Sequence, residues 1–365
     1  MIVYYLSFAT AAILSVLYPK VTLRSSCSLD QKRTCCIFIS FLPIAAVFLF
    51  RWGIGVDSNW AIGSYPVYYH ALANQEHIFI SEPLFEFIAS SCARVGISYF
   101  FWLFILGVFY LYSVGKFIKY NSSDYAMSIL LFFFSDLFFF AVGALRQALA
   151  ISFILLLYCD DPHSRMWKKV IYMLLAVLSH SSAVLGVVGY LFGNIKLSRR
   201  SALCGTVIIF FSAPLTTLLL KSMIGFTSYG SRYNGTSLAT DQFAITYVMV
   251  SGCILLCTLF EYDHIYNERT AKLINLLILF FFFMINSGAL IQTFRIIYYF
   301  MPAIIIIIPE IYKKASSNLS KFVLGGMATM SIILLFYNTY YRHDGKALYE
   351  NYQTIFSCIR MISAV

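Results

Sequence analysis

The sequence predicts an all-α polytopic membrane protein, and its composition is what predicts it. Across 365 residues, apolar and aromatic types make up 60% and charged types only 12%, against about 25% charged in an ordinary soluble domain. The 26 Lys and Arg and 16 Asp and Glu are too few to cover the surface of a water-soluble chain of this size. A chain with 35 Phe and 27 Tyr also could not stay solvated as a disordered polymer. The surrounding solvent must therefore be lipid.

Apolar runs of about 20 residues, or somewhat fewer where helices are broken, predict the membrane crossings. The run at 170–193 has basic residues at both ends, so we expect it to break at Ser179-His180-Ser181-Ser182 into two short helices. The count is then about 12 transmembrane helices, within a range of about 10 to 14. The predicted runs are 2–18, 35–50, 99–115, 125–142, 145–159, 170–193, 201–220, 243–260, 273–289, 296–311 and 322–338.

The short loops between these runs are rich in Lys and Arg, and this asymmetry orients the chain. Placing the basic loops in the cytoplasm puts 17 of the 26 Lys and Arg inside, as the positive-inside rule requires. The outer side then holds two longer loops, 51–82 and 221–242, an interfacial amphipathic helix over 83–98 and the tail 339–365. We expect a single integral membrane domain over 1–365. The formal charge of +10 needs no nucleic-acid partner.

Arginines left on the outer side at helix ends need a reason other than topology, because outer cations are mildly unfavourable. Arg51 begins the sequence Arg51-Trp-Gly-Ile-Gly55-Val-Asp57 directly after the second run. Its two glycines permit left-handed backbone, so Asp57 can fold back toward Arg51. The pair is either a structural contact or a phosphate ligand with its orienting carboxylate.

Two further arginines lie between pairs of apolar runs. Arg146-Gln147 heads the run 145–159, and Arg295 takes the equivalent place before 296–311. A guanidinium fork beside the free N–H groups of a helix N-terminus suits the oxygens of a diphosphate. Snorkelling of the arginine to lipid head groups is the alternative. Together these arginines predict an anion site on the outer side.

Several other polar residues are candidates for chemistry or binding. His180 is the only histidine inside an apolar region, where it acts either as a hydrogen-bonded core residue or as a general base. The second outer loop carries an arginine between tyrosines, a combination typical of sugar-binding surfaces. These loop residues are Tyr229, Arg232 and Tyr233. We expect no metal site, because the histidines and acids of the first outer loop do not follow a ligand spacing.

Five short motifs follow one another along most of the chain, and their order is informative. They are Arg51 to Asp57, Glu82-Pro83, Arg146-Gln147, His180-Ser-Ser-Ala183 and Phe294-Arg295-Ile-Ile-Tyr-Tyr299. In this order they resemble the EpsG-type polysaccharide polymerases, and through them the Wzy-like polymerases of O-antigen, capsule and exopolysaccharide assembly.

The resemblance implies a metal-independent glycosyltransferase without a cofactor, in the bacterial inner membrane, with its active site facing the periplasm. Its substrates would be oligosaccharide repeat units carried on undecaprenyl diphosphate within the membrane lipid. The growing glycan would pass from its lipid diphosphate to a hydroxyl of the next unit as the diphosphate leaves. The resemblance also leaves room for a chain-length regulator as a partner.

The same resemblance assigns roles to the candidate residues. Arg51, Arg146 and Arg295 would neutralise the leaving diphosphate, with Gln147 and the second outer loop beside the substrate. The attacking hydroxyl needs a proton acceptor, for which His180, Asp57 and Glu82 are the candidates. His180 comes first, because imidazoles titrate near neutral pH.

Three other classes of membrane protein stay open. An O-antigen ligase uses the same donor but delivers the glycan to lipid A core, and usually has a larger second outer loop. A flippase or other transporter for lipid-linked oligosaccharides would show paired charges along a pore and internal symmetry. A membrane acyltransferase would use a histidine, but it gives the outer arginines no role.

Overall fold

The computed structural model describes residues 1–21, 28–55, 64–74, 76, 82–159, 165–225, 241–287, 293–342, 345–350 and 352–356. Helices account for most of these ranges, which contain no strand beyond the isolated antiparallel bridge Arg51–Thr354. The predicted all-α class is therefore confirmed. The helices form two compact units, one of Met1–Val184 with Phe336–Val365 and the other of Leu185–Leu335. Each unit is described by itself.

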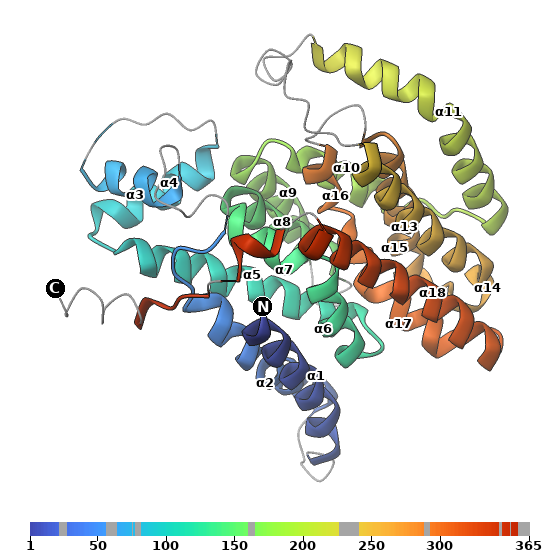
Figure 1. Ribbon diagram of the computed structural model, residues 1–365, viewed down its shortest axis with the longest axis horizontal. Helices are drawn as coiled ribbons and strands as arrows, with labels where there is room; N and C mark the ends of the chain where they lie inside the picture. Colours follow the sequence, from blue (N-terminus) through green and yellow to red (C-terminus); the bar gives the residue numbers. More distant parts are fainter. Residues whose placement is uncertain are drawn as a thin grey trace. The chain divides into compact units, whose positions relative to one another are not determined.

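The first unit is built from nine α-helices and two short helical turns in its described part (Figure 1). They are α1 (Ile2–Val21), α2 (Leu29–Leu49), α3 (Tyr65–Ala73), α4 (Pro83–Arg94), α5 (Tyr99–Asn121), α6 (Tyr125–Phe134), α7 (Leu137–Gly143), α8 (Leu145–Tyr158), α9 (Met166–Ser179), η4 (Asn338–Arg342) and η5 (Gly345–Leu348).

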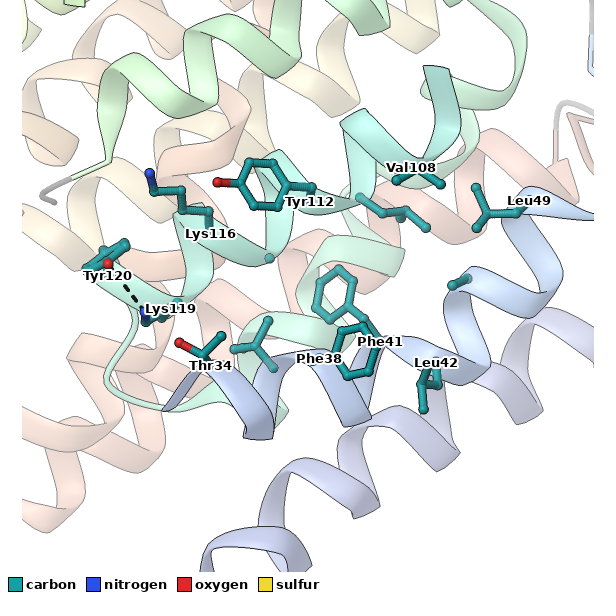
Figure 2. Close-up of a pocket in the computed structure, with 14 residues that line it drawn as sticks. Thr34, Phe38, Phe41, Leu42, Leu49, Val108, Tyr112, Lys116, Lys119 and Tyr120 are labelled. Atoms are coloured by element: carbon teal, nitrogen blue, oxygen red, sulfur yellow. Dashed lines mark hydrogen bonds between the residues drawn. The ribbon is translucent and has the colours of Figure 1, made fainter. Parts of the chain in front are cut away.

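Helix α8 forms the centre of the first unit. Most of its side chains are apolar, and all but Arg146 are buried, as expected of a helix packed on every side. It contacts α5, α7 and α9, while α4 packs on α3 and α9. Helix α2 packs on α1 and α5, and a groove remains between α2 and α5 (Figure 2). The packing of α8 and α4 on α9 positions the site described below.

The second unit is centred on α15, which contacts α11, α13, α16, α17 and η3. Asn275 of α15 is buried and donates to the carbonyl oxygens of Phe192, Gly193 and Ile195 at 3.1, 3.3 and 2.7 Å. It thereby satisfies acceptors that the end of α10 leaves without helical partners. The helices of this unit are α10 (Ala183–Gly193), α11 (Arg199–Gly225), α13 (Asp241–Phe260), α14 (Tyr262–Ile265), α15 (Glu268–Ile285), α16 (Thr293–Ile297), η3 (Met301–Ala303), α17 (Ile304–Lys314) and α18 (Asn318–Tyr337) (Figure 1).

Four helical segments among the described residues are long and apolar enough to cross a membrane. They are Leu29–Leu49, Tyr99–Asn121, Arg199–Leu220 and Asn318–Arg342. The bent pair α6 and α7 makes a fifth if the two helices count as one span. The chain is thus a membrane protein, whereas the expected number of about 12 spans and the outer-face positions of 83–98 and the two longer loops stay predictions. Shorter apolar helices cover Ile2–Tyr18, Leu145–Tyr158, Ala183–Gly193 and Ile245–Phe260.

Two predicted runs are broken in the structure. The run 125–142 bends by 50° between α6 and α7, where Asp136 has a left-handed φ of 69° and its carboxylate accepts a hydrogen bond from Tyr340. The run 296–311 is divided by η3, which contains Pro302. Proline lacks an N–H donor and so interrupts the helical hydrogen bonds. Hydrophobicity alone did not predict either break.

Candidate functional site

The break at His180 lies where the sequence predicts it. Helix α9 ends at Ser179 and α10 begins at Ala183. His180 is the C-cap of α9 with extended backbone (φ −161°, ψ 124°), and its N–H donates to the Ala176 carbonyl at 3.1 Å. The side chain is 16% exposed. The break therefore places an imidazole at a helix end, where the ring is largely but not completely shielded from solvent.

Glu82 is the N-cap of α4 and is 3% exposed. Pro83 follows it at the first helical position, where a fixed φ and the missing N–H cost the helix nothing. The Glu82 carboxylate accepts no hydrogen bond from the N–H groups of α4, so it is available to other partners. Because α4 packs on α9, this carboxylate is directed toward the end of α9.

Glu82 brings Arg146 and His180 together, and we call these three residues the Glu82 cluster. Its Oε2 accepts from Arg146 Nη1 at 2.9 Å, and its Oε1 lies 3.0 Å from His180 Nδ1. Burial opposes the negative charge, but the contacts with His180 and Arg146 outweigh it and lower the pKa of Glu82. Glu82 is therefore an ionised acceptor, so in the neutral imidazole Nδ1 carries the proton and Nε2 keeps its lone pair.

Arg146 lies in the first turn of α8, as the sequence predicts. Its backbone N–H donates to the Tyr65 hydroxyl at 3.4 Å, which ties α3 to the start of α8. The Arg146 side chain is 35% exposed; its Nη1 donates to Glu82, and the guanidinium also interacts with the Tyr65 hydroxyl. A partly exposed guanidinium at a helix N-terminus can bind an anion with its remaining donors.

The glycines after Arg51 have the left-handed backbone that the sequence permits. Gly53 has φ of 62° and Gly55 of 101°. A Cβ on Gly55 would meet the Cα of Gly143 at 3.2 Å, so this glycine lets the turn approach the end of α7, three residues before Arg146. Such an approach excludes any larger residue.

Arg51 itself is enclosed by protein. It is 5% exposed, its guanidinium carbon lies 4.1 Å from the centroid of the Phe48 ring, and its Nη1 donates to the Phe48 carbonyl. Burial lowers the pKa of Arg51 to about 10, which leaves it protonated at neutral pH. The backbone N–H of Trp52 donates to the Gln353 carbonyl at 3.0 Å. Residues near the C-terminus therefore pack beside Arg51.

Two of the other predicted site residues lie on helices that the structure describes. Gln147 is 2% exposed on α8, and Arg295 is exposed on α16 in the second unit. Asp57, Tyr229, Arg232 and Tyr233 lie outside the described residues. Their roles stay predictions.

Tyr65 is the residue of this region that sequence reasoning missed. It is 6% exposed, packs on Phe85 of α4 with ring centroids 5.8 Å apart, and meets the backbone of Arg146. In a chain with 27 Tyr, no local signal distinguishes it. Within the described ranges, no group of three His, Cys, Asp or Glu side chains could hold a metal ion.

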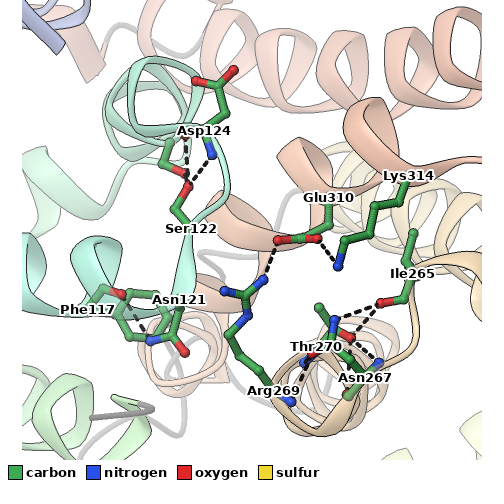
Figure 3. Close-up of polar contacts among 11 residues, drawn as sticks. Phe117, Asn121, Ser122, Asp124, Ile265, Asn267, Arg269, Thr270, Glu310 and Lys314 are labelled. Carbon is green, nitrogen blue, oxygen red and sulfur yellow. Dashed lines mark hydrogen bonds and ion pairs between the residues drawn. The ribbon is translucent and has the colours of Figure 1, made fainter. Parts of the chain in front are cut away.

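A second buried carboxylate lies in the other unit, in what we call the Glu310 cluster. Glu310 of α17 is 0% exposed. Its Oε1 accepts from Arg269 Nη2 at 2.6 Å and its Oε2 lies 2.8 Å from Lys314 Nζ (Figure 3). Lys314 follows Glu310 by one helical turn on α17, whereas Arg269 comes from α15. Nearby, the N-cap Asn267 and Thr270 form a capping box that begins α15.

A comparison with protein families identifies the chain. The search of curated proteins and the search of solved structures both returned no match. The model of the EpsG family matches residues 34–354, a range that includes Arg51, the Glu82 cluster and Arg295. By this match over most of its length, the chain belongs to the EpsG family.

Proposed function

We propose that this chain is a polysaccharide polymerase that joins undecaprenyl-diphosphate-linked oligosaccharide repeat units by glycosyl transfer at the outer face of the bacterial inner membrane. The family suggests a Wzy-like polymerase acting on a lipid-linked sugar. The observation that carries the proposal is the Glu82 cluster, in which one buried carboxylate holds an arginine at 2.9 Å and a histidine at 3.0 Å. Such a cluster offers an anion ligand and a proton acceptor side by side.

His180 serves as the general base in this proposal. Glu82 accepts the Nδ1 proton, as the orienting carboxylate does in the Ser-His-Asp arrangement, and leaves Nε2 free to take a proton. Glu82 has both oxygens engaged and is 3% exposed, so it acts through His180 as a positioning residue. Asp57 stays the second candidate for the base.

The proposed step is a direct displacement at the anomeric carbon of the donor. The acceptor hydroxyl gives its proton to His180 Nε2 while its oxygen bonds to that carbon. The bond between the carbon and the diphosphate oxygen breaks, and the electron pair leaves with the polyprenyl diphosphate. His180 then returns its proton to water. Atoms and charges balance without a further reactant.

The charge of the cluster changes in step with the reaction. With neutral His180, the positive charge of Arg146 and the negative charge of Glu82 cancel. When His180 takes the proton, the cluster becomes net positive as negative charge develops on the diphosphate. A favourable interaction that grows toward the transition state accelerates the reaction, whereas one already complete in the bound substrate does not.

The remaining predicted residues keep, in this proposal, the roles that the family resemblance gives them. Arg146 binds the leaving diphosphate with Gln147 beside it, and Arg51 and Arg295 add positive charge. Arg232, with Tyr229 and Tyr233, binds sugar or a second diphosphate. No metal ion or cofactor takes part in this proposal, and a chain-length regulator is its proposed protein partner.

The direct test is reconstitution of the full chain in phospholipid vesicles with a lipid-diphosphate-linked repeat unit from the native host. We expect a ladder of glycans that differ by one repeat, and only single units with the His180→Ala variant. Arg269→Lys, in the Glu310 cluster, serves as a matched control that should polymerise normally per folded molecule. A ladder from His180→Ala of wild-type length and rate would contradict the proposed base.

Deletion of the gene in the native host separates the alternatives. A surface glycan limited to one repeat would support a polymerase. Accumulated lipid-linked polymer that is never attached would indicate an O-antigen ligase, and lipid-linked single units trapped on the inner side would indicate a flippase. Complementation with the wild-type chain restores the ladder if the phenotype belongs to this gene.

A further inference from the structure

Tyr65 contacts Arg146 at two places. Its hydroxyl accepts from the Arg146 backbone N–H at 3.4 Å, and the Arg146 guanidinium also interacts with this hydroxyl. The N–H is one of the donors that the start of a helix leaves without a helical partner. The N-cap of α8 is Ala144, whose methyl side chain can accept no hydrogen bond. A tyrosine from α3 therefore takes the place of a capping side chain and holds the arginine at the same time.

The ring of Tyr65 is held in place by two fully buried aromatic side chains. Its centroid lies 5.8 Å from that of Phe85 of α4 and 6.5 Å from that of Trp102 of α5, and both neighbours are 0% exposed. Phe85 lies in the first turn of α4, three residues after Glu82. Tyr65 thus joins the helix that begins at Glu82 to the helix that carries Arg146, and its hydroxyl is fixed relative to both.

The two partners of the Arg146 guanidinium are both buried. Tyr65 is 6% exposed and Glu82 is 3% exposed, whereas the Arg146 side chain is 35% exposed. The exposed part of the guanidinium is therefore available to an anion. A phenol is uncharged at neutral pH, so Tyr65 orients the arginine without cancelling its charge. A second carboxylate in this place would give the cluster a net negative charge while His180 is neutral, and an anion would be repelled.

We propose that Tyr65 is a positioning residue, which fixes the Arg146 guanidinium in the orientation that meets the leaving diphosphate. The inference rests on the proposed function, because the diphosphate is the ligand of Arg146 there. Without the hydroxyl, Glu82 still accepts from Nη1, but the guanidinium can turn about that contact. Its remaining donors then point at the developing charge for only part of the time, and a misplaced donor stabilises the transition state less.

Tyr65→Phe tests the inference, because it removes the hydroxyl and keeps the ring. The initial rate of ladder formation in vesicles, per folded molecule, should fall about 10-fold, as is typical when the partner that orients a ligand is lost. Tyr69→Phe, on the same helix, is the matched control. The Tyr69 hydroxyl donates to the Ile97 carbonyl at 2.7 Å, away from Arg146. Its loss should lower the unfolding midpoint and leave the rate per folded molecule unchanged.

A double variant separates positioning from a general loss of packing. In the Arg146→Lys background there is no planar fork to orient, so adding Tyr65→Phe should lower the rate less than about two-fold. A merely structural tyrosine would lower the rate by the same factor in both backgrounds. With wild-type ladders present, an unchanged rate in Tyr65→Phe, an equal loss in Tyr69→Phe or independent losses in the double variant would overturn the inference and leave the proposed polymerase intact.

Binding of inorganic diphosphate decides the inference if the wild type forms no ladder, an outcome that counts against the proposed function. A ligand that binds the folded protein raises its unfolding midpoint. Diphosphate should raise the midpoint of the wild type and of Tyr69→Phe, and should raise it less in Tyr65→Phe and Arg146→Lys. No rise in the wild type, or equal rises in all four proteins, would then overturn the inference as well.

Discussion

Glu82 and Glu310 are buried carboxylates in different units, and each holds two basic side chains. Glu310 lies between Arg269 and Lys314, and Glu82 between Arg146 and His180. Exposure of the partners does not separate the clusters, since the Arg146 and Lys314 side chains are both 35% exposed. The clusters differ in the chemistry of the second partner, which is a histidine beside Glu82 and a lysine beside Glu310.

The difference between histidine and lysine decides what each cluster can do. Arginine and lysine stay charged at neutral pH, so the Glu310 cluster ties α15 to α17 with a fixed net charge. An imidazole can accept a proton at one ring nitrogen while the other donates, so the Glu82 cluster can exchange a proton with a ligand. A buried carboxylate with two basic partners is thus a structural feature in one unit and a candidate for chemistry in the other.

The largest expected effect comes from removing the imidazole. His180→Ala should reduce repeat-unit transfer by about 10²- to 10⁴-fold, the usual contribution of a general base. The measurement is the initial rate of ladder formation per folded protein in vesicles. The matched change Lys314→Ala in the Glu310 cluster should leave that rate unchanged. If both variants lose activity equally, the distinction between the clusters fails.

A smaller effect is expected from Arg146→Lys, which keeps the charge but loses the planar fork of donors. Transfer should fall about 10²-fold, as when one donor to a developing oxyanion is lost. Gel analysis of glycan length with immunodetection of the protein would show short glycans at normal protein levels. Long, normal ladders from this variant would exclude the fork of Arg146 as a diphosphate ligand.

Glu82→Gln tests the orientation of the imidazole. An amide can donate to His180 Nδ1 and so favour the tautomer that protonates Nε2. We expect a loss of about 10- to 100-fold in the transfer rate. The steady-state rate constants would show a fall in kcat with little change in KM. Glu310→Gln should instead lower the unfolding midpoint, because it leaves Arg269 and Lys314 without their carboxylate, and should spare the rate per folded molecule.

The smallest effect concerns the pH dependence of stability. The pKa of Glu82 is lower in the folded protein than its ordinary value of 4.5, so folding favours the ionised carboxylate. Its contribution to stability is fully present above that value and is lost as the pH falls through the lowered pKa. Thermal unfolding in detergent should show a difference between wild type and Glu82→Gln that shrinks as the pH falls below 4.5. A difference that grows over that acidic range would contradict the assignment.

Much of the local structure follows from the sequence, because its causes are local. The polar residues at Ser179 to Ser182 interrupt an apolar run, and the chain breaks there between α9 and α10. Gly53 and Gly55 have the left-handed backbone that their lack of Cβ permits. The bend at Asp136 was not predicted, because an aspartate with positive φ in an apolar run gives no periodic signal.

The sequence by itself determined that the protein is helical and membrane-embedded, and which polar residues interrupt its helices, since composition and apolar run length reflect the solvent directly. The tertiary structure decided which of those residues meet. Glu82 is 64 residues from Arg146 and 98 from His180 along the chain, and only the packing of α4 and α8 on α9 brings them together. Contacts at such separations depend on how helices pack, which no local pattern encodes.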